Sequence, residues 1–369
     1  MTGNLDSPSV RPARHTCSSE NRHLPLATMV TTAPRADARI ESIQDLYLRC
    51  YGWMLLGRTL EEKLASLYRG GFITGGVFLG KGQEALSAAL GMALRKGDIY
   101  APLIRDMAGR LAFGESVLDA ARTYLGSRQG PMRGRDGNIH RGQPQNGYYA
   151  MISHLGTLVA TVTGGLFARR TRGETDVVGA TCVGDGATST GSFHEGLNVA
   201  AVEKLPLVVV VANNQYAYST RTTRQYACED LIQRAAGYGV MGHKIDGTDP
   251  RACVEVVHEA VARARAGQGP QMIVADLLRL VGHGEHDDFS YVNHDLQSSP
   301  IGRDCIQVAK EQILEQGWST EADLRAWRDK ARTEVEEACA TANREPRPDP
   351  SEEDWCALST RNLAEGSTQ

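Results

Sequence analysis

The sequence of 369 residues lacks the features that mark several classes of protein. Its eight cysteines never form a close CxxC pair, which argues against a zinc knuckle or a disulfide framework and favours a reducing compartment. Lys and Arg total 40 against 44 Asp and Glu, so the basic excess of a nucleic-acid-binding protein is missing. The longest apolar run, at 205–212, has the length of a strand and is too short for a membrane span. We therefore expect a soluble, cytoplasmic protein whose partners include neither nucleic acid nor a membrane.

The distribution of apolar residues divides the chain into three parts. Residues 1–38 mix Ser, Thr, Pro, Arg and Asn without apolar periodicity, so we expect a disordered N-terminal tail. A transit peptide to the mitochondrial matrix is a less favoured alternative, because this segment contains acidic residues and no amphipathic face. Residues 39–350 should form one domain, since 41% of the chain is hydrophobic and no sharp linker interrupts it, and residues 351–369 form a C-terminal tail.

The domain is expected to be α/β, with a mainly parallel sheet flanked by helices. Buried strands alternate with helices through the middle of the chain, a pattern typical of parallel sheets with right-handed crossovers. Extra helices precede this part, and the C-terminal helices 304–344 follow it. The glycine-rich segment 127–149 predicts a long functional loop. The expected helices are 40–69, 82–94, 155–169, 190–203, 228–238, 250–266, 304–316 and 321–344, and the expected strands are 177–183, 205–212, 240–245 and 271–278.

Polar motifs follow two of the predicted strands. Gly184-Asp185-Gly186 ends the first strand and Asn213-Asn214 ends the second, with the 26 residues 187–212 between the motifs. One βαβ unit would place both motifs at the carboxyl edge of adjacent strands, where open α/β sheets bind ligands. Side-chain oxygens from Asp185 and Asn214 suit a hard cation such as Mg²⁺, which keeps substrate phosphates in its remaining positions. Each motif alone would indicate only a turn or a strand end, but the spaced pair indicates a diphosphate bound through a metal.

This pair of motifs resembles the thiamine diphosphate motif, in which GDG is followed after about 25 to 30 residues by NN. In that family the Asp, the second Asn and a backbone carbonyl two residues beyond hold the metal. The resemblance therefore implies that Asp185, Asn214 and the carbonyl group of Tyr216 bind Mg²⁺. It also implies that the segment from Gly184 to Ala187, which contains Gly186, binds the cofactor.

Further segments between about Asp45 and Asp349 resemble the α subunit of the first component of 2-oxoacid dehydrogenase complexes. GKGQEAL at 80–86 resembles the GQEA helix start of that family. LIRDMAG at 103–109 resembles its aromatic-Arg pair, which implies that Arg105 contacts the cofactor diphosphate, with Ile104 in place of the aromatic residue. ISHLGTLVATVTGG at 152–165 resembles the segment that holds the aminopyrimidine with backbone groups, which assigns this role to Ser153 and Leu155.

Two of these segments have a second interpretation. In the helix at 155–169, small residues at positions 156, 160 and 164 would also let another helix approach closely, and both interpretations can hold together. RLVGHGEHDDFSYV at 279–292 resembles the active-site loop of the family, so His283 takes the place of its His as a catalytic and cofactor-binding residue. Gly284 replaces the Ser that kinases phosphorylate in mitochondrial members. The His and carboxylate side chains of 283–288 could instead form a metal cluster.

The resemblance implies an enzyme that decarboxylates a 2-oxoacid on thiamine diphosphate and passes the acyl group to a lipoyl arm of an acyltransferase component. The carboxylate that activates the cofactor ring belongs in this family to a separate β chain, which implies an α2β2 heterotetramer. The sequence at 314–350 resembles the branched-chain members, and Ile104 leaves an apolar wall beside Arg105, so we expect branched 2-oxoacids to be preferred. A pyruvate or acetoin dehydrogenase α subunit and a non-catalytic scaffold paralogue are the alternatives.

Overall fold

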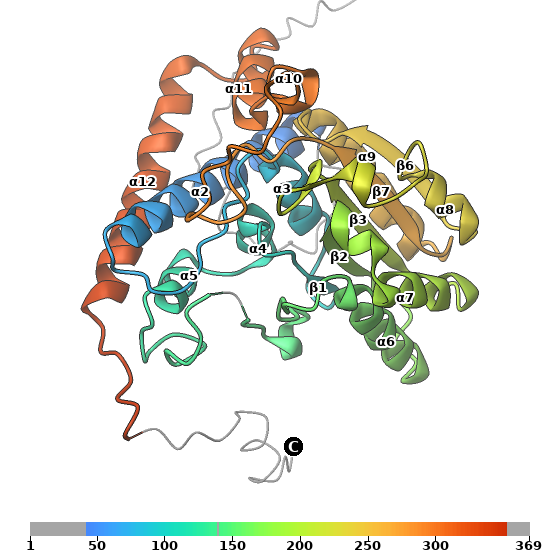
Figure 1. Cartoon of the computed structure of the whole chain (residues 1–369), viewed down its shortest axis with the longest axis horizontal. Coiled ribbons are helices and arrows are strands. Elements are labelled where there is room, and N and C mark those ends of the chain that lie inside the picture. Colours follow the sequence, from blue (N-terminus) through green and yellow to red (C-terminus); the bar gives the residue numbers. More distant parts are fainter. Residues whose placement is uncertain (1–41, 139, 353–369) are drawn as a thin grey trace, which may run out of the picture.

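The computed structural model describes residues 42–138 and 140–352, and the predicted tail 1–38 and residues 353–369 of the predicted C-terminal tail lie outside these ranges (Figure 1). In the described part, five parallel strands form one sheet in the order β1-β2-β3-β7-β6. The expected α/β class with a parallel sheet is confirmed. The strands are β1 Ile99–Ala101, β2 Gly179–Gly184, β3 Leu207–Asn213, β6 Met241–Asp246 and β7 Gln271–Asp276, and a separate hairpin joins β4 Tyr216–Ala217 to β5 Thr220–Arg221.

The central strand β3 shows why the sheet is buried on both faces. All seven of its residues are buried, and their side chains alternate between two hydrophobic clusters. Val209 and Val211 belong to the cluster that includes helices α6 and α7, whereas Val208 and Val210 belong to the cluster that includes α3 and α9. The continuous apolar run in the sequence is therefore the signature of a strand covered by helices on both sides.

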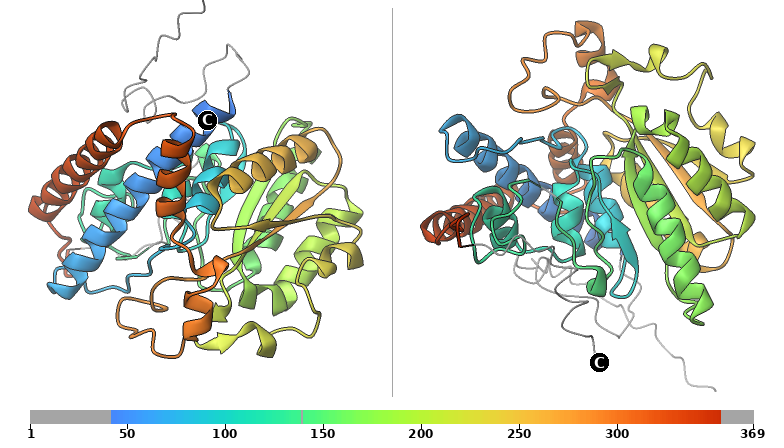
Figure 2. Two further views of the ribbon diagram at one scale, coloured as in Figure 1. Left: turned by 90° about the horizontal axis from the view of Figure 1, so that it is seen from above. Right: turned by 60° about the horizontal axis from the view of Figure 1, so that its bottom comes forward.

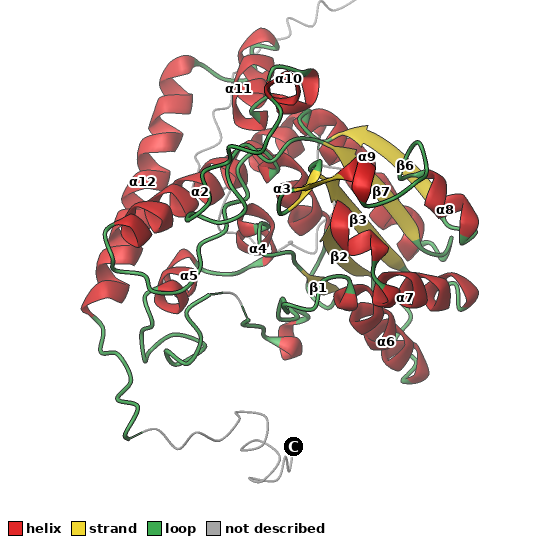
Figure 3. Cartoon of the chain, in the orientation of Figure 1, coloured by secondary structure: helices red, strands yellow, loops and turns green. Residues whose placement is uncertain are grey.

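Helices cover both faces of the sheet, as the two views of Figure 2 and the colouring of Figure 3 show. Helices α6 and α7 pack together on one face, and α9 packs on the other face against α3 and α2. The helices around the sheet are α3 Glu84–Ala93, α4 Met107–Phe113, α6 Thr157–Thr171, α7 Gly191–Val202, α8 Gln233–Gly237 and α9 Pro250–Arg265.

The additional helices form a layer beside the sheet. Helix α12 (Glu321–Arg344) packs along α2 (Ile43–Arg69) and α5 (Val117–Tyr124), at the left of Figure 1. The side chain of Ser42 caps α2, and Thr320 and Asp323 form a capping box at the start of α12. The short α10 (His294–Gln297) and the longer α11 (Cys305–Glu315) lie between β7 and α12 in the chain. The sequence therefore places these helices correctly at both ends of the domain.

The sequence missed the segment that connects α3 to the loop at 127–149. Strand β1 has three residues, too few for a periodic pattern, and α4 and α5 are short helices of seven and eight residues. The helix expected at 228–238 is confined to Gln233–Gly237. Its beginning is lost because the side chain of Asp230 accepts a hydrogen bond from the amide of Ile232 at 3.2 Å and pairs with Lys244.

Within the described part, no helix combines the length and apolar character needed to cross a membrane. The six cysteines in this part are all free thiols, five of them buried.

Candidate active site

Three oxygen-bearing groups meet where β2 and β3 end. Asp185 follows β2 and Asn214 follows β3, and the two strands are parallel neighbours with Gly184 opposite Ala212. One terminal atom of the Asn214 amide lies 3.2 Å from Oδ1 of Asp185 and 3.0 Å from the carbonyl oxygen of Tyr216. With nitrogen in this position the amide donates to both oxygens, and with oxygen there three oxygens face one point. The second orientation gives the ligands that Mg²⁺ prefers, so the three residues fit a hard cation.

The loop after β2 leaves space beside this point. A Cβ on Gly184 would have no atom within 4 Å, whereas a Cβ on Gly186 would lie 2.5 Å from Cβ of Ala217. Gly184 therefore leaves room for a ligand, and Gly186 lets the strand that carries Tyr216 approach. Asp185 is 1% exposed, and this burial raises its pKa to about 6 although Gln225 donates a hydrogen bond to its Oδ2 at 2.6 Å.

Two buried arginines, Arg105 and Arg279, lie near the same edge of the sheet. Nη1 of Arg105 donates to the carbonyl oxygen of Leu79 at 2.8 Å, and Nη2 donates to the carbonyl oxygen of His283 at 2.6 Å. Arg279 donates to the carbonyl oxygens of Val281 and Tyr218 at 2.9 and 3.2 Å. Burial and the charge of Arg279 lower the pKa of Arg105 to about 9. Tyr291 adds a hydroxyl partner to Arg279. Because these partners are neutral oxygens rather than carboxylates, an anion such as a diphosphate would compensate both charges.

The GKGQEA turn fits closely against Arg105. A Cβ on Gly80 would lie 2.1 Å from the carbonyl oxygen of Arg105, so only glycine allows this approach. The amide of Gly80 donates to the carboxyl group of Glu61 at 2.8 Å, which holds the turn against helix α2. Ile104, the neighbour of Arg105, is half-buried against both hydrophobic clusters.

His283 is held between charge and aromatic rings. Its Nδ1 lies 3.4 Å from Nη2 of Arg105, and its ring centroid lies 4.4 Å from that of Tyr218 and 5.3 Å from that of Phe78. Burial, Arg105 and Arg279 lower the pKa of His283 to about 4. The imidazole is therefore neutral near pH 7, and its nitrogen facing Arg105 acts as a hydrogen-bond acceptor.

The loop that carries His283 is fixed by polar contacts and by a small apolar cluster. Asp287 accepts hydrogen bonds from the amide of His283 and the hydroxyl group of Tyr291, and Glu285 pairs with Arg69. Val292 is buried and packs with Tyr216 and Leu278. In the described residues, no group of three His, Cys, Asp or Glu side chains is arranged to hold a metal ion, so the alternative metal cluster at 283–288 is not formed.

Ser153 and Leu155 lie just before helix α6, and Leu155 lines a small crevice together with Gly156 and Ala187. The hydroxyl group of Ser153 lies 2.9 Å from Nε2 of His140, whose Nδ1 lies 2.8 Å from Oδ2 of Asp136. Because the carboxylate can only accept, Nδ1 of His140 carries a proton and donates it to Asp136. Leu155 is 52% exposed, so about half of its apolar side chain remains in contact with solvent.

The sequence identified the motif residues but missed the groups around them. Asp185, Asn214 and Tyr216 meet at one point, as the spacing of the motifs suggested. The contact between Arg105 and His283 was not predicted. Arg279, Gln225 and the pair Asp136–His140 were not identified. Arg279 stood within the quoted loop segment RLVGHG, where an Arg close to a proposed diphosphate site was a usable signal. Gln225 and His140 had no such signal, because only the fold brings them to Asp185 and Ser153.

Comparison with known proteins identifies sequences that are similar to this chain. The profile of the family described as dehydrogenase E1 component matches residues 51–351. The chain belongs to this family. A pyruvate dehydrogenase E1 component subunit alpha from Rhizobium meliloti is 36% identical over 83% of this chain and 88% of the relative. This E1 chain is also 36% identical, over 71% of its length and 77% of the relative, to a 2-oxoisovalerate dehydrogenase subunit alpha from Bacillus subtilis.

A third relative of the E1 chain differs in its substrate. The alpha subunit of an acetoin:2,6-dichlorophenolindophenol oxidoreductase from Cupriavidus necator is 30% identical over 88% of this chain and 97% of the relative. The names of the three relatives refer to three different substrates. The pyruvate and 2-oxoisovalerate dehydrogenase subunits are equally identical to this chain. Sequence similarity places the chain in the E1 family without distinguishing between these substrates.

Proposed function

We propose that this chain is the α subunit of an E1 enzyme that decarboxylates a 2-oxoacid on thiamine diphosphate and passes the acyl group to a lipoyl carrier. The observation that carries the proposal is the convergence of Asp185, Asn214 and the carbonyl group of Tyr216 near two buried arginines. Together they supply oxygen ligands for Mg²⁺ and positive charge for a diphosphate. When bound, the cofactor supplies the electron sink for decarboxylation, and the protein supplies orientation and electrostatics.

The role that we assign to His283 follows from its environment. The ring is neutral near pH 7 and is held by Arg105 and Tyr218 beside the proposed diphosphate site. A neutral imidazole can orient an incoming group or accept its proton, whereas a cation next to two arginines could not. We infer that His283 acts in transfer of the acyl group, with Ser153 and Leu155 holding the cofactor ring through their backbone groups.

The active site is proposed to be completed by a β chain in an α2β2 heterotetramer. Helices α6 and α7 approach each other closely at Gly196. A Cβ at this position would lie only 2.6 Å from the amide nitrogen of Ala160. Gly164, by contrast, faces open space, and Phe167, Val199 and Val202 are exposed on the same pair of helices. These exposed apolar side chains, which lie beside the ion pair of Arg170 with Glu203, suit another subunit better than water. A cytoplasmic location and the division into 1–38, 39–350 and 351–369 belong to the same proposal.

The experiment that tests the function is a melting assay with cofactor and metal. Thiamine diphosphate with Mg²⁺ should raise the Tm of the assembly by mass action, and Asp185→Ala should abolish the Mg²⁺-dependent part of this shift. Asp176→Ala is the matched control, because Asp176 lies before the opposite end of β2 and is largely exposed. Retention of the full Mg²⁺-dependent shift in Asp185→Ala would contradict the site assignment. If the wild-type chain shows no cofactor binding at all, the non-catalytic scaffold alternative is favoured.

The substrate is proposed to be a branched 2-oxoacid, ahead of pyruvate or acetoin. The support is Ile104, a half-buried aliphatic side chain next to Arg105, together with the C-terminal helices. One methylene in an apolar pocket contributes about 1 to 3 kcal/mol, so we expect preference rather than exclusion. The measurement is kcat/KM of the α/β enzyme for 3-methyl-2-oxobutanoate, pyruvate and acetoin. A clear preference for pyruvate or acetoin would overturn the branched-chain assignment.

A further inference from the structure

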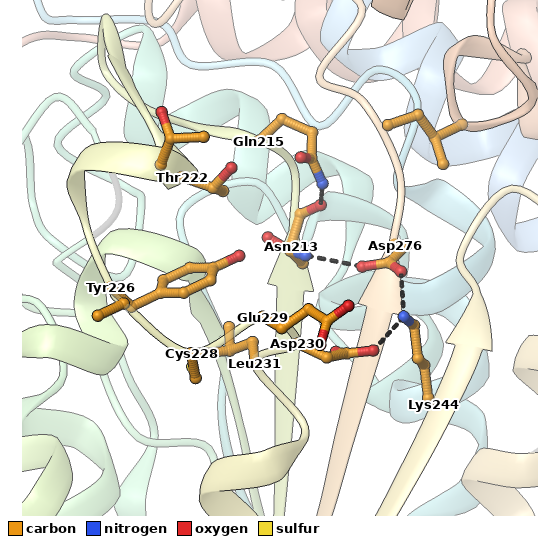
Figure 4. A pocket seen from close by; sticks show the side chains of 13 residues that line it. Asn213, Gln215, Thr222, Tyr226, Cys228, Glu229, Asp230, Leu231, Lys244 and Asp276 are labelled. Carbon is orange, nitrogen blue, oxygen red and sulfur yellow. Dashed lines mark hydrogen bonds and ion pairs between the residues drawn. The ribbon is translucent and has the colours of Figure 1, made fainter.

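A second polar cavity opens at the carboxyl ends of β3 and β7, beside β6 (Figure 4). Its volume is about 590 Å³, within the range of roughly 300 to 1,000 Å³ that is typical of small-molecule sites. The lining comes from the ends of the strands and from the segment between the β4–β5 hairpin and α8. Tyr226 and Thr222 lie on one side of the cavity, and acidic side chains lie on the other.

Three carboxyl groups and one ammonium group line this cavity. Nζ of Lys244 pairs with Asp230 and lies 3.4 Å from Oδ2 of Asp276, and Glu229 lines the cavity beside them. The Lys244 side chain is 47% exposed, so it can leave the two carboxylates without losing buried contacts. Its position shows that the acidic side of the cavity accommodates a primary ammonium group on an aliphatic stem.

Asn213 provides an independent indication of a missing ligand. Its Nδ2 donates to Oδ1 of Asp276 at 2.7 Å, which fixes the orientation of the amide. Its Oδ1 is buried, and the residue is only 6% exposed and lines the cavity. This oxygen forms no hydrogen bond of good geometry in the described part of the chain, although the hydroxyl group of Tyr226 is near enough to interact with Asn213. A buried acceptor without a donor destabilises the folded chain, so a ligand that supplies an N–H or O–H donor would be favoured here.

We propose that the cavity binds a small primary amine that carries a hydroxyl group. The ammonium group displaces Lys244 from Asp230 and Asp276 and donates one N–H to Oδ1 of Asn213. The hydroxyl group faces Thr222 and Tyr226 on the other side. A metal ion is a poorer occupant, because the acidic side chains are not arranged as a metal site within the described residues. An anion is repelled by the carboxylates. The cavity adjoins the candidate metal site, since Asn213 precedes Asn214 and the charge of Asp185 acts on Tyr226, but the amine takes no part in the proposed decarboxylation.

The test uses the full chain and three matched probes. 4-Aminobutan-1-ol should bind, as measured by calorimetry and by the NMR shift of the Asn213 side-chain amide. Butane-1,4-diol, which lacks the charge, and the trimethylated amine, which lacks N–H donors, should each bind at least tenfold more weakly. Equal binding of the amine and the diol would overturn the proposal.

Two substitutions should change the affinity in opposite directions. Asp276→Asn keeps an acceptor for Asn213 but removes a charge, so the Kd for 4-aminobutan-1-ol should rise at least tenfold. Lys244→Met removes the competing ammonium group and keeps the stem, so the Kd should fall severalfold. Lys310→Met is the control, since Lys310 pairs with Glu321 at 3.0 Å away from the cavity lining. Weaker binding by Lys244→Met, or unchanged binding by Asp276→Asn, would contradict the proposed contacts.

Discussion

Among single residues, Glu61 shows how burial changes the chemistry behind the candidate site. It is 3% exposed, and burial together with the charge of Glu84 raises its pKa from 4.5 to about 8. Its carboxyl group accepts a hydrogen bond from the amide of Gly80, and Gly80 lies in the turn that packs against Arg105. Glu61 is therefore protonated at neutral pH and helps to position the turn without adding a negative charge.

The raised pKa of Glu61 predicts a pH-dependent stability. The folded chain keeps a proton that the unfolded chain loses above pH 4.5, so the free energy of unfolding falls as pH rises from about 4.5 to about 8. At about 1.4 kcal/mol per pH unit, the loss over this range should amount to roughly 5 kcal/mol. Glu61→Gln keeps an acceptor for Gly80 and should remove this contribution, as measured by urea unfolding between pH 5 and 8.5. The exposed Glu62→Gln is the control; if the two variants show the same pH profile, Glu61 does not titrate as described.

His283 gives a second prediction for a single residue. Arg279 is one of the charges that lower its pKa to about 4, so Arg279→Met should move this pKa upward toward 6.5. The imidazole resonances can be followed by NMR titration and assigned with His283→Gln. Arg303→Met, at an exposed arginine that pairs with Asp246, should leave the pKa unchanged. An unchanged pKa in Arg279→Met would mean that burial and Arg105, without a contribution from Arg279, lower the pKa of His283.

Among the elements, the loop at 127–149 has a structural role that connects it to the proposed cofactor site. Asp136 and His140 lie in this loop, and Nε2 of His140 shares a hydrogen bond with the hydroxyl group of Ser153 before α6. Gly156 begins the helix with φ of 82°, and a Cβ there would lie 2.2 Å from Oγ1 of Thr190. The start of α6 is thus positioned both by the loop at 127–149 and by the loop that follows β2.

Substitution of His140 should loosen this entry. His140→Ala removes the bond to Ser153, which contributes about 1 kcal/mol, so hydrogen exchange of the amides at 153–156 should become severalfold faster. Asp136→Asn, which no longer fixes the proton on Nδ1, should give a smaller effect in the same direction. His294→Ala, in α10, is the control. Unchanged exchange in His140→Ala would show that the helix start is held by backbone contacts alone.

On the scale of the whole molecule, the exposed apolar side chains indicate an incomplete assembly. Phe167, Val199 and Val202 lie on α6 and α7, and Leu155 lies at the start of α6, each more than two-fifths exposed. The proposed aminopyrimidine contacts lie at the same end of α6 as Leu155. A β chain that covers this surface could therefore also complete the cofactor site.

The isolated chain is accordingly expected to be inactive, and addition of its β chain should give decarboxylation at ordinary rates of about 1 per second or more. Val202→Lys should weaken this assembly, because it places a charge on an apolar surface, as measured by sedimentation and by reconstituted activity. Met241→Lys is the matched control, an exposed apolar side chain on β6. Full activity of the purified chain alone would refute the requirement for a second subunit.

The sequence by itself determined the α/β class, the strands that carry the motifs and the convergence of Asp185 with Asn214. These features depend on local patterns: a run of apolar residues makes a buried strand, and polar residues directly after parallel strands must share one edge of the sheet. The helices at both ends of the domain were predictable for the same reason, since their periodicity and caps lie within the segments themselves.

Only the tertiary structure decided which distant groups surround these motifs. Arg279 reaches Tyr218 across 61 positions of the chain, Gln225 reaches Asp185 across 40, and His140 reaches Ser153 from a loop without regular structure. The neutral state of His283 and the unpaired oxygen of Asn213 also depend on the folded chain. Burial and neighbouring charges set protonation and hydrogen-bond satisfaction, and a chain acquires both only when segments far apart in sequence pack together.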